Sequence, residues 1–122
     1  MRVLVDTSVW VDYLRQGDRQ LSSLLEKDEV FCHPLIVGEL ACGRLEPRTE
    51  ILHRLDLLPK TPLVQNSEAI QFIEEHGLWA KGIGFIDIHI LASALLGRAE
   101  FWTRDKRLRL IALDLRIAFL EG

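Results

Sequence analysis

The sequence predicts one α/β domain, with a central parallel sheet flanked by helices on both faces. Short apolar runs alternate with helical patterns along the chain, which is typical of a parallel sheet covered on both sides. The length of 122 residues suits one domain. A hydrophobic share of 48% and a charged share of 27% are those of globular chains and exclude disordered and fibrous proteins. We therefore treat residues 1–122 as a single domain.

The first half of the chain begins with a buried strand, residues 2–5, an apolar run that stops at Asp6. Thr7 or Ser8 can cap the helix that follows, because a side-chain oxygen accepts a hydrogen bond from an exposed N–H group of the first turn. The pair Gly17-Asp18 breaks that helix. The pattern then predicts a short helix at 21–25, a strand at 30–32, a helix from 33 to about 43 and a helix at 47–57.

In the second half, Pro59 and Pro62 confine the next segment to a loop or a short strand at 63–64, because proline cannot donate to a strand ladder. Asn66 and its neighbours cap a helix that runs toward Gly77. The remaining elements are expected as an apolar helix at 85–96, a strand at 100–103, a helix at 106–113 and a terminal strand near 117–119.

Charge and cysteine content exclude several classes of protein. With 15 Lys+Arg against 18 Asp+Glu, the chain is not a generally basic coat for nucleic acid, so any nucleic-acid binding must come from a local patch. Cys32 and Cys42 form no CxxC pair, which indicates two reduced thiols in a cytoplasmic protein. No uncharged stretch is long enough for a transmembrane helix, and the first apolar run ends too early for a secretory signal.

Four acidic residues occupy positions where a carboxylate is unusual, next to or within apolar segments. Asp6 ends the first strand, Glu39 interrupts an apolar helix, Asp87 is the only charge in its helix, and Asp105 follows the last clear strand. Helix capping could explain the three aspartates, and an arginine partner such as Arg44 could explain Glu39, which is costly to bury alone. A metal site explains all four together, because converging carboxylates repel each other and favour a hard divalent cation such as Mg²⁺ or Mn²⁺.

Four blocks of the sequence resemble, in order, the PIN-domain ribonucleases, and most closely their VapC toxins. The blocks are VLVDTSVWVDYL, GELACG, FIDIHILASAL and FWTRDKRL, and the resemblance covers nearly the whole chain. It implies the three-layer PIN fold. It places the family's catalytic and metal-binding acids on Asp6, Glu39, Asp87 and Asp105, and its supporting hydroxyls on Thr7, Ser8 and Thr103. The chain departs from the family at Ile36, where Ser or Thr is common, and at Leu108, where an aromatic residue is common.

The resemblance implies a Mg²⁺-dependent endoribonuclease, with Mn²⁺ able to substitute, that acts as the toxin of a type II toxin–antitoxin system. Such a protein would cleave structured cellular RNA, tRNA or rRNA, and would be neutralised by a small VapB-like antitoxin. The family also implies a homodimer, alone or in a heteromeric complex with the antitoxin. The alternative is a non-catalytic PIN-like module that binds RNA or protein. The complete set of acids argues against that alternative, because degenerate members usually lose metal ligands.

A cluster of five cations surrounds the last acid within residues 98–109. It is either a solvated helix face or a rim that holds an RNA backbone, which the acids alone would repel. In the second case Arg104, Lys106 and Arg107 are the candidate RNA-binding residues.

The tryptophans and histidines are expected to be structural. Trp10, Trp79 and Trp102 are predicted to anchor the core or an interface, because stacking on RNA bases would need an exposed ring beside the basic rim. The four histidines show no metal-ligand spacing. His89 lies nearest in sequence to a predicted site acid, and we expect it too to be a structural residue.

Overall fold

A sheet of three parallel strands in the order β2-β1-β3 lies at the centre of the molecule. The computed structural model describes residues 1–122, and its strands are β1 (Val3–Val5), β2 (Val30–Phe31) and β3 (Glu100–Trp102). Val3 of the central strand pairs with Val30 on one side and with Glu100 on the other. All of β1 is buried, as expected of a strand covered on both faces. The predicted α/β fold with a parallel sheet is confirmed.

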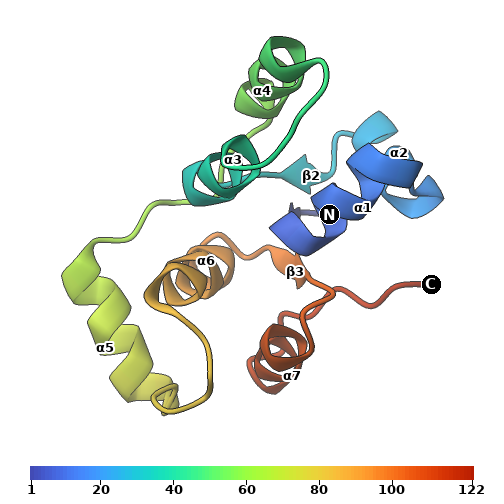
Figure 1. Cartoon of the computed structure of the whole chain (residues 1–122). Helices are drawn as coiled ribbons and strands as arrows, with labels where there is room; N and C mark the ends of the chain where they lie inside the picture. The colour runs from blue at the N-terminus through green and yellow to red at the C-terminus, as the bar shows by residue number, and fades with distance from the viewer.

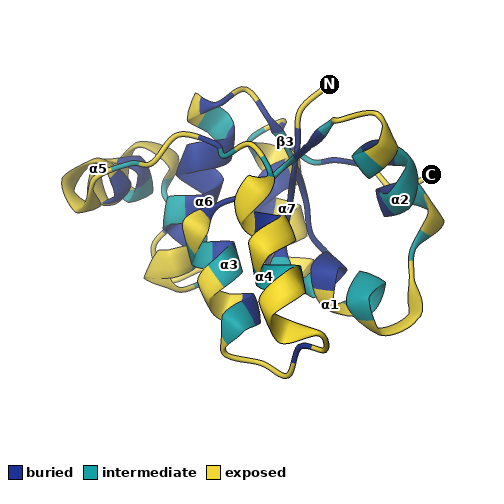
Figure 2. Ribbon diagram, turned by 90° about the horizontal axis from the view of Figure 1, so that it is seen from above, coloured by how far each residue is buried: buried dark blue, intermediate teal, exposed yellow.

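Seven helices surround this sheet, and Figure 1 shows α2 on one side of it and α6 on the other. Helix α6 passes through the core: half of its twelve residues are buried, and its ribbon is largely dark blue in Figure 2. None of the helices is long and apolar enough to span a membrane. The helices are α1 (Thr7–Gln16), α2 (Arg19–Glu26), α3 (Pro34–Ala41), α4 (Arg48–Leu57), α5 (Asn66–His76), α6 (Phe85–Leu96) and α7 (Lys106–Asp114).

Two segments beside the sheet form only single bridges to it. Lys60 pairs with Cys32, and the N–H of Thr61 donates to the carbonyl of Cys32, but Pro62 has no N–H to continue the ladder. Residues 63–64 are a loop, which is one of the two alternatives predicted for them. Near the C-terminus only Ala118 pairs with β3, because Arg116 adopts a left-handed φ of 61° that keeps the preceding chain out of the strand.

The arrangement of the sheet determines where functional side chains can gather. Parallel strands have their carboxyl ends at one edge, and ligands of such folds bind beyond that edge. Asp6 follows β1 and Thr103 follows the neighbouring β3, so both lie there. Helix α6 leads into β3 through a short link and so runs opposite to the strands, which places its first turn, with Asp87, at the same edge.

Candidate active site

Asp6 is held rigidly at the carboxyl end of β1. Its N–H donates to the carbonyl of Trp102 at 2.8 Å, and the residue is only 6% exposed. Its Oδ2 accepts hydrogen bonds from the hydroxyls of Ser8 and Thr103, each at 2.8 Å. Its Oδ1 accepts none, and the side chain makes no capping bond to α1. The capping explanation for Asp6 is therefore wrong: one oxygen is fixed by two hydroxyls and the other is free to take a ligand.

The turn after β3 brings Asp105 to the same edge. The hydroxyl of Thr103 accepts from the N–H of Asp105 at 3.1 Å, and the N–H of Arg104 donates to Ser8 Oγ at 3.0 Å. Asp105 Oδ1 accepts from the N–H of Leu108 at 3.1 Å and so caps α7. The capping explanation thus holds for one oxygen of Asp105, and its second oxygen makes no hydrogen bond.

Asp87 belongs electrostatically to the same group of acids. It lies half-buried in the first turn of α6, where the N–H of Gly84 donates to its Oδ2 at 3.2 Å. Burial raises the pKa of Asp87, and the negative charges of Asp6 and Asp105 raise it further, while the bond from Gly84 opposes them. Asp87 therefore lies close enough to Asp6 and Asp105 to sense their charges, while one of its oxygens also caps α6.

Glu39 joins this group through a hydroxyl rather than through burial. The structure places it on the exposed side of α3, because Ile36 and Leu40 are the residues that this helix buries. The interpretation of Glu39 as a core acid is therefore wrong, and Arg44 forms no ion pair with it. Its Oε1 instead accepts from the hydroxyl of Thr7 at 2.7 Å. Since Thr7 follows Asp6 in the chain, this bond ties Glu39 to the start of α1.

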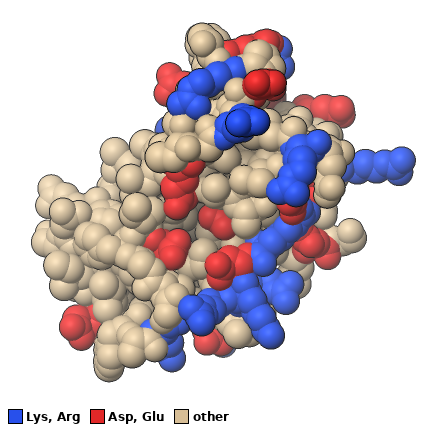
Figure 3. Space-filling view, viewed as in Figure 1, with Lys and Arg blue, Asp and Glu red and all other residues tan.

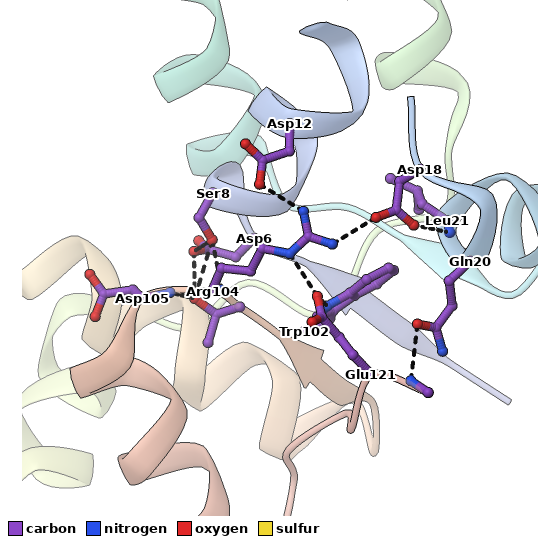
Figure 4. A network of polar contacts seen from close by, with 12 residues as sticks. Asp6, Ser8, Asp12, Asp18, Gln20, Leu21, Trp102, Arg104, Asp105 and Glu121 are labelled. Atoms are coloured by element: carbon purple, nitrogen blue, oxygen red, sulfur yellow. Dashed lines mark hydrogen bonds and ion pairs between the residues drawn. The ribbon is translucent and has the colours of Figure 1, made fainter. Parts of the chain in front are cut away.

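Arg104 has different partners from those that the sequence suggests. Figure 4 shows its guanidinium between three carboxylates, with distances of 2.7 Å to Asp12, 2.7 Å to Asp18 and 2.6 Å to Glu121. It also lies 5.5 Å from the ring centre of Trp102. The bond to Asp18 is the largest of the effects that raise the pKa of Arg104. With its side chain only 28% exposed, and with Nε, Nη1 and Nη2 each bound to a carboxylate, Arg104 joins α1, the cap of α2 and the C-terminal segment, and its charge is already neutralised.

Lys106 and Arg107, by contrast, are exposed at the start of α7. Arg107 Nη1 donates to the carbonyl of Gly82 at 3.2 Å, and Lys106 forms no ion pair. In Figure 3 acidic atoms lie in the middle of the face, and basic atoms border them along the edge where α7 lies. Lys106 and Arg107 therefore remain candidates for a basic rim, whereas Arg104 is held by carboxylates.

Comparison with known proteins agrees with this arrangement. The family model described as PIN domain matches residues 3–113. The chain is also 42% identical to Ribonuclease VapC32 of Mycobacterium tuberculosis over 120 aligned residues. The alignment covers 98% of this chain and 97% of that relative. The chain belongs to the PIN-domain family. The VapC-type membership that the four sequence blocks indicate is confirmed with it, since this 42% identity extends over nearly the whole chain.

Two solved structures share the fold of this PIN domain. FitAcB from Neisseria gonorrhoeae aligns with a TM-score of 0.61 at 20% identity, covering 98% of this chain and 96% of that one. PAE2754 from Pyrobaculum aerophilum also gives 0.61, at 15% identity, covering 91% and 79%. At these identities the likeness concerns the fold, and it confirms the predicted PIN-like architecture.

The donor set of this PIN domain suits a hard divalent cation, because every candidate ligand is a carboxylate oxygen. As the side chains stand, no three His, Cys, Asp or Glu residues converge closely enough to hold an ion. Asp6 is fixed, whereas Asp87 is half-buried and Asp105 and Glu39 are exposed, so those three can turn toward it. The residues fit a metal that draws the outer carboxylates onto Asp6.

A buried histidine, His33, lies just after β2, beyond the carboxyl end of that strand. His33 is 1% exposed, and its Nδ1 accepts from the N–H of Leu35 at 3.0 Å, which caps α3. Its hydrogen is then on Nε2, which is buried without a partner. Burial, together with the charge of His89, lowers the pKa of His33 to about 4. The pair His33-Pro34 was the available signal, since a helix with proline at its first position needs a cap before it.

The depressed pKa of His33 predicts acid destabilisation. Between pH 6.5 and about 4 the unfolded chain protonates this histidine and the folded protein does not, so its contribution to stability is complete above pH 6.5 and falls below it. We expect a loss of roughly 3 kcal/mol over the whole window, of which about 2 kcal/mol falls between pH 7 and pH 5. Urea unfolding at pH 7 and pH 5 measures it. His33→Asn, which keeps a capping acceptor, should lose less stability between the two pH values, and an equal loss would contradict the assignment.

Proposed function

We propose that this PIN domain is a Mg²⁺- or Mn²⁺-dependent endoribonuclease toxin that cleaves structured cellular RNA, tRNA or rRNA, and is neutralised by a VapB-like antitoxin. The observation that carries the proposal is that Asp6, Asp87 and Asp105 lie at one edge of the sheet, where one oxygen of Asp6 is held by two hydroxyls and the other makes no hydrogen bond. The near full-length similarity to a ribonuclease supports it.

Each residue of the site has a defined task under this proposal. Ser8 and Thr103 hold Oδ2 of Asp6 and so orient the carboxylate, which leaves Oδ1 available to the metal ion. Asp6 and Asp87 are the two nearest ligands of the metal ion under this proposal. Asp105 and Glu39 complete the set of metal ligands. A bound Mg²⁺ or Mn²⁺ would supply an activated water and neutralise charge on the phosphate being cleaved. Without it the carboxylates repel the phosphate, so cations at the border are needed to hold the RNA.

An apolar cleft next to Glu39 supports the proposed antitoxin partner. Thr7 and Glu39 form one end of a cleft of about 360 Å³ between α1, α3 and α4. Leu14 and Ile51 join it to a second cleft of about 640 Å³ that reaches Trp10. An antitoxin segment with apolar side chains in these clefts would also cover Glu39, and so would occlude the acids. Leu63, Ile70 and Leu96, exposed on and beside α5 and α6, support the proposed homodimer.

The direct test is incubation of the purified protein with bulk tRNA and with rRNA in Mg²⁺. Discrete fragments are expected, and none when the antitoxin encoded beside the gene is added first. Intact RNA with every divalent metal, together with tight RNA binding, would favour the non-catalytic binding module.

A further inference from the structure

One of the three tryptophans is not in the core. Trp10 and Trp102 are 3% and 1% exposed, as the sequence predicts, but Trp79 is 61% exposed. It lies in the connection between α5 and α6, so of the two roles expected for the tryptophans the core role is wrong for Trp79. An exposed indole beside cations is what base stacking requires.

The ring of Trp79 lies beside the turn that ends α5. Gly77 ends α5 with a left-handed φ of +61°, and a Cβ at that position would lie 3.9 Å from Cζ3 and 4.0 Å from Cη2 of the indole. The ring therefore lies against the bare backbone of Gly77. The next residue, Leu78, is buried and its N–H donates to the carbonyl of Ile73 at 2.9 Å. The indole is thus presented by an anchored segment while most of its surface faces solvent.

The same connection is attached to the basic border of the site. Arg107 donates to the carbonyl of Gly82, and a Cβ on Gly82 would come within 2.8 Å of Nη1, so only glycine lets the guanidinium lie there. Arg107 and the exposed Lys81 line a hollow of about 420 Å³. At its other end the connection supplies the N–H of Gly84 to Asp87. The segment that carries Trp79 therefore links the exposed ring to the acids.

We propose that Trp79 is a stacking platform for a base of the RNA substrate, and that Lys81, Lys106 and Arg107 hold the phosphates between this base and the acids. The inference rests on the proposed function. Because Arg104 is bound by three carboxylates, the exposed cations that remain beside Asp105 are those at the start of α7, and Arg107 connects them to the α5–α6 segment. They set the path of the RNA backbone.

A contact between two copies of the chain would explain the exposed ring less well. A two-fold contact places the same surface of both copies together. Centred on Trp79, it would bring Lys81 and Arg107 near their own counterparts, and like charges facing each other disfavour association. Phosphates neutralise the same cations.

The test uses Asp6→Asn protein, so that RNA is bound but not cut, with two probes: a fluorescent 12-nucleotide single-stranded RNA and inorganic polyphosphate of similar charge. In the Asp6→Asn background, the second substitution Trp79→Ala should weaken RNA binding about ten- to a hundredfold. It should leave polyphosphate binding unchanged, because stacking needs a base. Trp79→Phe should recover most of the affinity. Leu57→Ala, which removes an apolar side chain that is 70% exposed on α4, is the matched control and should bind both probes like its parent.

The salt dependence separates the roles of the ring and the cations. Trp79→Ala should leave the slope of log affinity against log salt unchanged, whereas Lys106→Glu/Arg107→Glu should flatten it, by about 0.7 for each phosphate that the protein no longer neutralises. RNA affinity unchanged by Trp79→Ala overturns the inference, while cleavage by the wild type in Mg²⁺ would leave the proposed function intact. Sedimentation checks whether Trp79→Ala also dissociates a dimer. If the loss of affinity follows that dissociation, Trp79 belongs to an interface between copies, and the inference is overturned. If the parent binds neither probe and the wild type cuts no RNA, both proposals fail.

Discussion

Asp6→Asn is expected to abolish RNA cleavage while leaving the protein folded. The amide oxygen can still accept from Ser8 and Thr103, so the hydrogen bonds that fix the side chain persist. The amide nitrogen then occupies the free position, where it cannot bind a cation. Losing a metal that contributes several kcal/mol to transition-state stabilisation lowers the rate by at least about a thousandfold. The measurement is the rate of RNA cleavage in Mg²⁺, with thermal unfolding as the check on folding.

The matched variants make this result specific to the site. Asp56→Asn removes an exposed carboxylate on α4 and should cleave like the wild type. Glu39→Gln should retain residual activity, because its amide oxygen can still accept from Thr7 and because the family resemblance places Glu39 at the border of the metal site. A folded Asp6→Asn protein that cuts RNA at the wild-type rate would falsify the catalytic role of Asp6.

Replacing Arg104 is expected to cause the largest loss of stability among the basic residues near the site. Arg104→Met removes three ion pairs and leaves Asp12, Asp18 and Glu121 to repel one another. Because the side chains are partly exposed, we expect a loss of about 1–3 kcal/mol in the free energy of unfolding, less than for a fully buried network.

Urea unfolding of Arg104→Met, beside Arg109→Met as the exposed control, measures this effect. Arg109 forms no ion pair, and its replacement should cost less than about 0.5 kcal/mol. An Arg104→Met protein with wild-type stability and weakened RNA binding would restore the phosphate contact that the sequence suggests.

The sequence predicts the sheet and the position of the aspartates because both follow from local signals. An apolar run that ends in an acid identifies β1 and Asp6, and parallel pairing then brings Thr103 and Asp105 to the same edge. The hydroxyls are predictable as partners of Asp6 only through the family resemblance, since ninety-seven positions separate Asp6 from Thr103.

The partners of the arginine and the exposure of the tryptophan depend on tertiary contacts. In the sequence Arg104 looks like Lys106 and Arg107, but its partners come from α1, the cap of α2 and the C-terminal segment, which only the fold brings together. In the sequence Trp79 likewise resembles the two core tryptophans. In the structure it follows the left-handed Gly77 that ends α5, and its side chain is exposed. Glu39 follows the same rule, because which face α3 buries is decided by the elements packed against it.

The central claim is that these carboxylates hold a divalent cation, and thermal unfolding with and without Mn²⁺ tests it most directly, because it needs no knowledge of the RNA. The wild type should unfold at a higher temperature in Mn²⁺, since a ligand that binds only the folded state stabilises it. Asp6→Asn/Asp87→Asn should show no such shift. Without metal the double variant should be at least as stable as the wild type, because it lacks the half-buried charge of Asp87 and its repulsion by Asp6, both of which raise the pKa of Asp87. No Mn²⁺ shift in the wild type, or an equal shift in the double variant, would contradict the account.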